Sequence, residues 1–175
     1  MDFGPQFTIS RTMDAQKTAD CAKMMSSTEP WITYAMDYEY CVKAFDGESK
    51  EIYILENQHS IAGFVILQVG GTFKGYIQTL CVDDMYRGQG LGKKLLQFCE
   101  ERILCISPNI FICVSSFNKG AIKLYYEFGF KLVGELTGFV KEGLTELLLR
   151  KTFGAIVGFH STSPVSAGSG TADPA

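Results

Sequence analysis

The segment Arg87-Gly88-Gln89-Gly90-Leu91-Gly92-Lys93 decides the fold, because of the elements expected on either side of it. Before it lies the β-rich run 76–82, and after it apolar residues recur at every fourth position from Leu91 to Ile103, which predicts a helix beginning near Gln89. First-turn amides and the positive end of a helix dipole attract anions, and glycines let the backbone approach a phosphate closely. The segment is therefore a candidate phosphate-binding loop. A glycine-rich connection without a ligand is the alternative.

Two common phosphate-binding motifs do not fit this loop. A P-loop requires a second glycine five residues after the first, and a dinucleotide-binding fingerprint beginning at Gly88 requires a glycine at the same place. Lys93 occupies that position. The spacing therefore excludes both motifs.

The rest of the chain supplies strands and helices around this strand, loop and helix. Alternating and continuous apolar runs predict strands at 6–10, 51–56, 61–69, 76–82, 110–114, 130–136 and 145–151. Helical spacing and capping residues predict helices at 14–25, 34–45, 89–103 and 118–128. The turn-forming stretches 57–60 and 70–75 favour three consecutive antiparallel strands. A helix between the strands at 76–82 and 110–114 makes those two strands parallel.

Composition places the chain among ordinary globular proteins. It has 175 residues, 46% hydrophobic and 20% charged, which suits a single domain over 1–160 followed by a flexible tail over 161–175. The formal charge of −3 and the absence of a basic arm argue against a nucleic-acid partner. The longest apolar runs fall short of the ~20 residues of a membrane span, and the first residues do not form a secretory signal. We expect a cytoplasmic protein.

Cysteines and histidines do not suggest a metal site. None of the six cysteines forms a C-x-x-C pair, and most lie in apolar segments, so reduced structural thiols are expected. The two histidines, His59 and His160, are too few for a histidine-rich metal site or a Ser-His-Asp triad. No metal is expected.

Two spaced motifs stand on the expected elements. Arg87, Gly90 and Gly92 match the pattern [QR]-x-x-G-x-[GA] after the fourth strand, and the segment from Asn118 to Phe130 matches N-x-x-A-x-x-x-Y-x-x-x-G-F after the fifth strand. With both motifs the chain resembles the GNAT superfamily of acyl-CoA-dependent N-acetyltransferases. The resemblance covers about residues 6–152. It implies a mixed α/β (α+β) fold with a mostly antiparallel seven-stranded sheet, a parallel pair formed by its fourth and fifth strands, and four flanking helices.

Two further segments, Glu29-Pro30-Trp31 and Ser115-Ser116-Phe117-Asn118, narrow the resemblance. They look most like the ribosomal-protein-alanine N-acetyltransferases. A Pro-Trp pair that merely fixes a loop against the core is the alternative.

The superfamily resemblance implies acetyl-CoA as co-substrate and a set of residues that bind it. Pantetheine would add to the open edge of the fourth strand, and loop amides would hold the pyrophosphate. The Asn118 side chain would face the pantetheine arm or simply cap its helix. The full predicted coenzyme site comprises Leu80, Cys81, Val82, Arg87, Gly88, Gln89, Gly90, Leu91, Gly92, Lys93 and Asn118.

Acetyl transfer to an amine needs a neutral nucleophile, an oxyanion site and an acid for the departing thiolate. Amides near Leu80 or Cys81 are the oxyanion candidates. The resemblance places the general acid at Tyr125; a helix turns about 100° per residue, so the adjacent Tyr126 cannot face the same cleft. A core aromatic is the alternative role for Tyr125.

The general base does not follow the family pattern. The resemblance places the family's glutamate at Cys113, and a thiol is not a direct substitute for a carboxylate. Glu29 or Glu39 acting through water is one alternative. An acceptor amine of low pKa that arrives already partly neutral is another.

The sequence is compatible with two classes of acetyl acceptor. One is a protein N-terminal α-amine; the other is a small amine such as a polyamine, an amino acid or an antibiotic. Trp31, Tyr34, Tyr38 and Phe139 are candidate pocket walls, whereas the short connection 137–144 leaves room for a peptide. A third hypothesis is that the chain is a non-catalytic acyl-CoA-binding module. The expected oligomeric state is a monomer or a homodimer.

Overall fold

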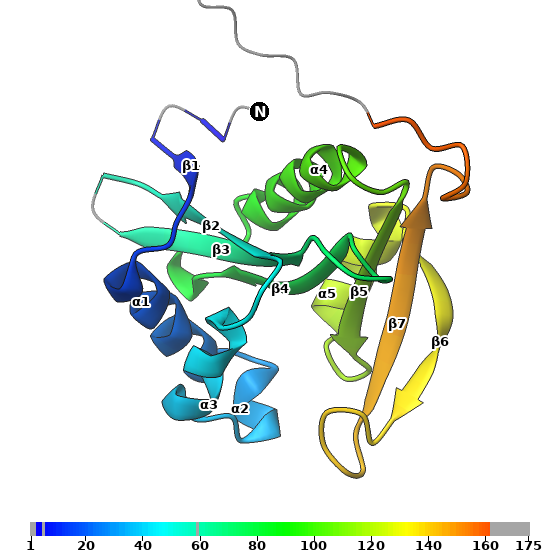
Figure 1. Cartoon of the computed structure of the whole chain (residues 1–175). Helices are drawn as coiled ribbons and strands as arrows, with labels where there is room; N and C mark the ends of the chain where they lie inside the picture. Colours follow the sequence, from blue (N-terminus) through cyan, green and yellow to red (C-terminus); the bar gives the residue numbers. More distant parts are fainter. Residues whose placement is uncertain (1–2, 5, 59, 162–175) are drawn as a thin grey trace, which may run out of the picture.

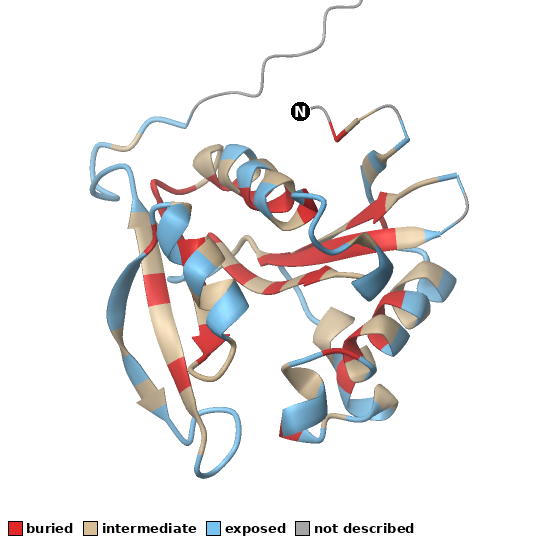
Figure 2. Ribbon diagram, turned by 180° about the vertical axis from the view of Figure 1, so that it is seen from behind, coloured by how far each residue is buried: buried red, intermediate tan, exposed pale blue. Residues whose placement is uncertain are grey.

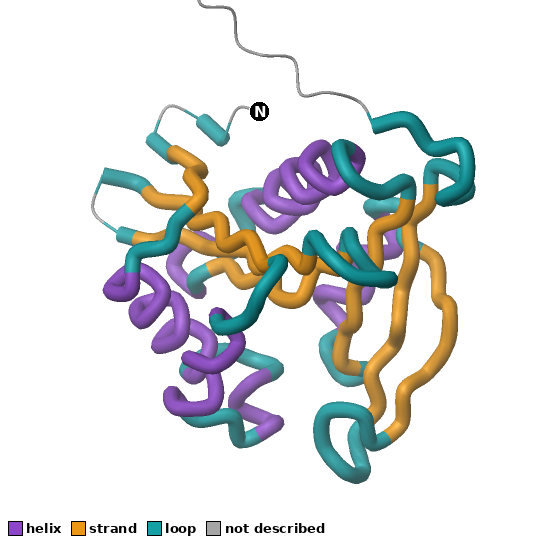
Figure 3. Tube along the Cα trace, in the orientation of Figure 1, coloured by secondary structure: helices purple, strands orange, loops and turns teal. Residues whose placement is uncertain are grey.

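The fold is built on one seven-stranded sheet with helices on both faces (Figures 1 and 3). The computed structural model describes residues 3–4, 6–58 and 60–161, so His59 and residues 162–175 of the expected tail lie outside the described part. The strands follow the order β1-β2-β3-β4-β5-β7-β6. Their bounds are β1 Thr8–Arg11, β2 Lys50–Glu56, β3 Ile61–Gln68, β4 Tyr76–Val82, β5 Asn109–Ser115, β6 Lys131–Thr137 and β7 Thr145–Thr152. The helices are α1 Ala15–Ser26, α2 Trp31–Tyr34, α3 Tyr38–Val42, α4 Leu91–Leu104 and α5 Lys119–Glu127, with the 3-10 helices η1 Lys43–Phe45 and η2 Asp84–Tyr86.

The predicted fold class and strand arrangement are confirmed. β1 to β4 pair antiparallel in succession, β4 and β5 are parallel, and β7 pairs antiparallel with both β5 and β6. The helix α1 begins as expected, because the Asp14 side chain accepts a hydrogen bond of 2.8 Å from the Lys17 amide.

The helix predicted at 34–45 is wrong in its bounds, and the prediction of four helices is corrected to five α-helices within the described residues. The chain turns out of α2 at Ala35, which has the left-handed φ of 57°. It starts again at Asp37, whose carboxylate accepts from the Tyr40 amide at 2.8 Å and caps α3. The range 34–45 therefore contains α3 and η1, whereas α2 ends at the first residue of that range.

Two apolar cores lie on opposite faces of the sheet. In Figure 1, α4 lies above and α1 to α3 lie below the strands β2 to β4, and Figure 2 shows buried residues along those strands. The first core joins α4 and α5 to the sheet, and the second joins α1 and α3 to it. The first includes Ile112 and Val114 of β5. Because side chains alternate along a strand, Cys113 and Ser115 point to the opposite face, toward the side of α1 to α3.

The sheet opens between β4 and β5. The two strands pair only at Tyr76 with Phe111 and at Ile77 with Ile112. Beyond Ile77, β4 remains paired with β3, but its other edge has no strand partner among the described residues. The opening separates β4 and the glycine loop that follows it from β5 and the start of α5.

Candidate active site

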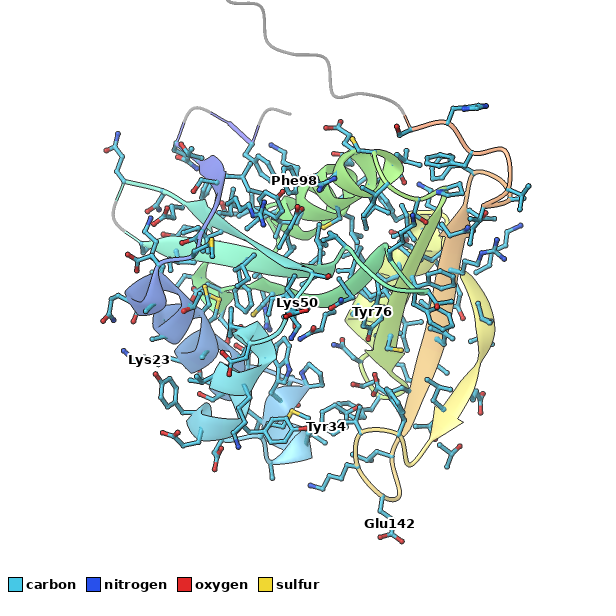
Figure 4. The ribbon with its side chains drawn as sticks, in the orientation of Figure 1. Lys23, Tyr34, Lys50, Tyr76, Phe98 and Glu142 are labelled. Atoms are coloured by element: carbon cyan, nitrogen blue, oxygen red, sulfur yellow. The ribbon has the colours of Figure 1, made fainter. Side chains whose placement is uncertain are left out.

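A cleft of about 620 Å³ occupies the opening between β4 and β5. It is lined from one side by residues 76–82 of β4 and by the glycine loop, and from the other by residues 112–115 of β5 and the first turns of α5. Trp31 and Tyr34 of α2 and Phe139 and Val140 of the β6–β7 loop line it as well. In Figure 4, Tyr76 lies beside the opening and Tyr34 lies below it on α2.

The structure brings most of the predicted coenzyme residues to this cleft. Ten of them line it, and the exception is Gln89, whose side-chain amide donates to the Met85 carbonyl at 3.4 Å. The ten are Leu80, Cys81, Val82, Arg87, Gly88, Gly90, Leu91, Gly92, Lys93 and Asn118.

The glycine loop presents a helix N-terminus to the cleft without a side-chain cap. Gly88 and Gly90 have φ of 76° and 77°, a left-handed backbone that favours glycine. Gly90 occupies the N-cap position of α4 and no described side chain caps the helix, so amides of the first turn remain available. Arg87 is half-exposed at the cleft and pairs with Asp84 at 2.9 Å. Such a terminus suits an anionic group.

Tyr125 and Asn118 reach the cleft from α5. Tyr125 is 6% exposed and lines the cleft, whereas Tyr126 is 43% exposed and does not. Burial raises the pKa of Tyr125, so its phenol keeps its proton at neutral pH. The Asn118 carboxamide accepts from the Ala121 amide at 3.2 Å and caps α5. The cleft therefore has a protonated phenol on the face of α4 and α5.

Cys113 lines the cleft but is a poor base. Burial raises the pKa of its thiol, and the nearby negative charge of Glu146 acts in the same direction, while a hydrogen bond with Tyr76 opposes them. The sulfur therefore stays protonated near neutral pH.

Glu146 is the acidic residue that the sequence analysis missed. It lies on β7 opposite Ser115 of β5, lines the cleft, and is 6% exposed. The Tyr34 hydroxyl donates to Glu146 Oε1 and lies 2.6 Å from Ser115 Oγ. The one available signal is the position of Glu146 on the predicted strand 145–151, directly before the apolar run 147–149. The register that sets Glu146 beside Ser115 appears only in the folded sheet.

The other predicted acidic and aromatic residues are divided between the cleft and its surroundings. Glu29 lines the cleft and is exposed, with its carboxylate accepting from the Thr33 amide at 3.3 Å. Glu39 is exposed and does not line the cleft. Tyr38 is likewise outside it and packs against the core beneath α1 and α3. Trp31, Tyr34 and Phe139 do line it.

Charge is distributed unevenly along the cleft. The cationic side chains that line it, Arg87 and Lys93, stand at the glycine loop and the start of α4. The acidic ones, Glu29 and Glu146, lie beside α2 and on β7. One part of the cleft therefore suits an anion and the other a cation.

The described residues contain neither a metal-binding cluster nor a membrane-spanning helix. Within 3–4, 6–58 and 60–161, no group of three or more His, Cys, Asp or Glu side chains is arranged to hold a metal ion. No helix in the same residues has the length and apolar character needed to cross a membrane.

Known proteins similar to this chain are acetyltransferases. The sequence model of the acetyltransferase (GNAT) family matches residues 17–130. An acetyltransferase of Agrobacterium fabrum is 32% identical over 113 residues, which cover 62% of this chain and 77% of that protein. A spermine/spermidine N(1)-acetyltransferase of Bacillus subtilis is 35% identical over 63 residues, covering 35% of this chain and 41% of that relative.

The fold is also similar to a solved structure. The ribosomal-protein-S18-alanine N-acetyltransferase of Escherichia coli matches with a TM-score of 0.64 at 20% identity. The match covers 91% of this chain and 97% of that one. At this identity the likeness concerns the fold.

Proposed function

Because the chain belongs to the acetyltransferase (GNAT) family, we propose that it transfers acetyl from acetyl-CoA to a primary amine bound in the cleft between β4 and β5. One observation supports this most directly. The unpaired edge of β4, the uncapped N-terminus of α4 and the buried phenol of Tyr125 all border the same cleft.

These residues fit acetyl-CoA part by part. The pyrophosphate is held by amides between Arg87 and Lys93, where glycines keep the backbone open. The pantetheine amides pair with the free edge of Leu80 to Val82, as an added strand would. Asn118 faces the pantetheine arm while its carbonyl oxygen caps α5.

Acetyl transfer in this cleft uses groups from β4 and from α5. The amine nitrogen attacks the thioester carbonyl, and the oxyanion that forms is stabilised by a β4 amide near Leu80 or Cys81. When the C–S bond breaks, Tyr125 donates its proton to the thiolate. Cys113 keeps its proton, so it does not activate the amine.

Two classes of acceptor are compatible with the relatives. The E. coli structure is named for a ribosomal-protein alanine, which makes a peptide N-terminal α-amine one class. The B. subtilis relative is named for polyamines, which makes a small amine the other.

The experiment that tests this function is acetylation of an amine panel. The protein is incubated with acetyl-CoA and either N-terminal peptides or small amines, and acetylated products are detected by mass spectrometry. We expect one acetyl group on a primary amine. Tight binding of CoA without acetylation of any acceptor would contradict the proposal and favour a non-catalytic acyl-CoA-binding module.

Gly90→Ala is expected to weaken CoA binding at least about tenfold. A methyl group at Gly90 would meet no described protein atom within 4 Å. Because Gly90 lines the cleft, the methyl group would project into the space proposed for the pyrophosphate. The φ of 77° adds a strain of about 1–2 kcal/mol. Isothermal titration calorimetry with CoA measures the effect.

Gly71→Ala is the matched control for strain. Gly71 has the same φ of 77° and equally open surroundings, but lies in the β3–β4 connection and does not line the cleft. Both variants should lose similar stability, and only Gly90→Ala should lose CoA affinity. Equal CoA affinity in the two variants would place the coenzyme elsewhere.

A further inference from the structure

Glu146 is a buried carboxylate without a cationic partner. It is 6% exposed, and it forms no ion pair with any described residue. Burying a carboxylate is costly unless hydrogen bonds or a cation compensate. Tyr34 and Ser115 provide hydroxyl groups beside it, but a carboxylate has about four acceptor positions. Glu146 therefore retains room for a donor from a ligand.

Glu146 reaches the cleft from the face opposite Tyr125. Ser115 and Glu146 are paired across β5 and β7, next to α2, which supplies Tyr34. Tyr125 belongs to the core on the face of α4 and α5. The opening between β4 and β5 connects the two faces, so a group bound at Glu146 meets the thioester from the side away from Tyr125.

The walls around Glu146 favour a compact ligand. Trp31, on the helix that supplies Tyr34, and Phe139 of the β6–β7 loop both line the cleft. The Lys141 ammonium donates to the Thr33 carbonyl at 3.1 Å, which ties that loop to α2. A loop held close to α2 in this way favours a small amine over a peptide beside Glu146. Aromatic rings also interact favourably with an organic cation.

We propose that Glu146, held by Tyr34 and Ser115, is the site for the acceptor ammonium group, and that the acceptor is a compact primary amine cation. This inference rests on the proposed acetyl transfer and specifies its acceptor. Glu146 binds the ammonium and then takes one proton from it, which leaves a neutral amine.

The proton balance closes with Tyr125. The neutral nitrogen forms the C–N bond, the C–S bond breaks, and the thiolate takes the Tyr125 proton. The second proton lost by nitrogen restores Tyr125, and the proton on Glu146 leaves to solvent. The products are the acetamide, CoA thiol and one released proton.

The surroundings of Glu146 make it a stronger proton acceptor than an exposed glutamate. Burial raises the pKa of Glu146, although the hydrogen bonds with Tyr34 and Ser115 oppose the shift. The titratable groups that face it are Tyr34 of α2, Tyr76 of β4 and Cys113 of β5, and burial raises the pKa of each of them. They remain neutral while Glu146 titrates, so the acid side of the pH profile for kcat/KM reports on Glu146. This acid limb should disappear in Glu146→Gln.

The direct test is amine binding to the complex with CoA, because binding does not require acetyl transfer. Isothermal titration calorimetry measures how tightly four compounds bind the CoA-saturated protein. They are spermidine, phenethylamine, its uncharged analogue 2-phenylethanol, and a tetrapeptide with an N-terminal alanine. The CoA-saturated wild type, Glu146→Gln and Glu142→Gln are compared. Glu142 is the matched control, because it is an exposed glutamate at the tip of the β6–β7 loop, away from the cleft (Figure 4).

We expect at least one of the two amines to bind the wild type at least tenfold more tightly than 2-phenylethanol and the peptide. Glu146→Gln should weaken that binding at least tenfold, and Glu142→Gln should change it less than twofold. Tighter binding of the peptide, absence of amine binding, or unchanged binding in Glu146→Gln would overturn the inference. CoA affinity and the melting temperature establish that each variant is folded. If Glu146→Gln does not fold, Tyr34→Phe takes its place and should weaken amine binding at least threefold.

The two proposals fail in different ways. Amine binding that depends on Glu146 but is followed by no acetylation would contradict the transferase function and leave the ammonium site standing. Acetylation that proceeds equally well in Glu146→Gln would contradict the ammonium site and leave the transferase function standing.

Discussion

Replacement of Tyr125 by phenylalanine should lower kcat at least about 100-fold, the low end of what a general acid contributes. The phenol borders the cleft and is protonated at neutral pH because burial raises its pKa. Phenylalanine preserves the ring and its contact with Phe130, 6.0 Å between centroids, but removes the only proton that the residue can give. Steady-state kinetics with mass-spectrometric detection of product measures the change.

Tyr126→Phe is the control on the same helix. Tyr126 is largely exposed and does not line the cleft, so its hydroxyl should affect kcat less than twofold. CoA affinity should stay within about twofold in both variants. If Tyr125→Phe retained full kcat, Tyr125 would be a core aromatic and the acid would have to be water or another group.

Arg102→Ala should lower the free energy of unfolding by about 3 kcal/mol, because removing one partner of a buried ion pair leaves the other charge uncompensated. Arg102 of α4 donates to both oxygens of Glu51 on β2, at 2.7 Å each, and Glu51 is 6% exposed. Arg11 remains 3.5 Å from Glu51 but is half-exposed and replaces only part of the lost pairing. Urea denaturation measures the change.

Lys123→Ala is the comparison for an exposed pair. Lys123 and Glu127 lie 3.9 Å apart on the surface of α5, and such pairs contribute about 0–1 kcal/mol. A similar loss of unfolding free energy in both variants would mean that the buried pair of Arg102 and Glu51 stabilises the fold no more than an exposed pair does.

The ion pair between Arg102 and Glu51 also makes the stability of the fold depend on pH. Burial alone raises the pKa of Glu51, but hydrogen bonds from Arg102 and Tyr53 and the charges of Arg102 and Arg11 outweigh it and hold the pKa below its ordinary value. The folded state therefore binds the Glu51 proton more weakly than the unfolded chain does. The resulting stability is present above the ordinary pKa of a glutamate and is lost as the pH falls through the lowered value. Arg102→Ala should reduce this acid-dependent loss.

The predictable features of the fold and cleft depend on residues close together in the chain. The loop at 87–93 is marked by its glycines and by the strand and helix patterns beside it, and most of its residues line the cleft. The periodicity of α5 separates Tyr125 from Tyr126, and their exposures differ accordingly. The catalytic role of Tyr125 stays a prediction.

The unpredicted features depend on contacts between distant residues or on rare backbone conformations. Glu146 meets Ser115 because β7 inserts between β5 and β6, a register that local patterns do not encode. Tyr34 meets Glu146 across 112 positions of sequence. The break after α2 requires alanine at a φ of 57°, a conformation that alanine seldom adopts.

Transfer of an isotopically labelled acetyl group shows directly whether the protein is an acetyltransferase acting on small amines. The protein is incubated with acetyl-CoA carrying ¹³C in the acetyl group and with spermidine, phenethylamine and the alanine tetrapeptide in separate reactions. We expect labelled N-acetyl product on a small amine, one molecule per CoA released, at a rate proportional to the enzyme concentration. Label that stays on CoA, or that appears only as acetate at the same rate with and without amine, would contradict it.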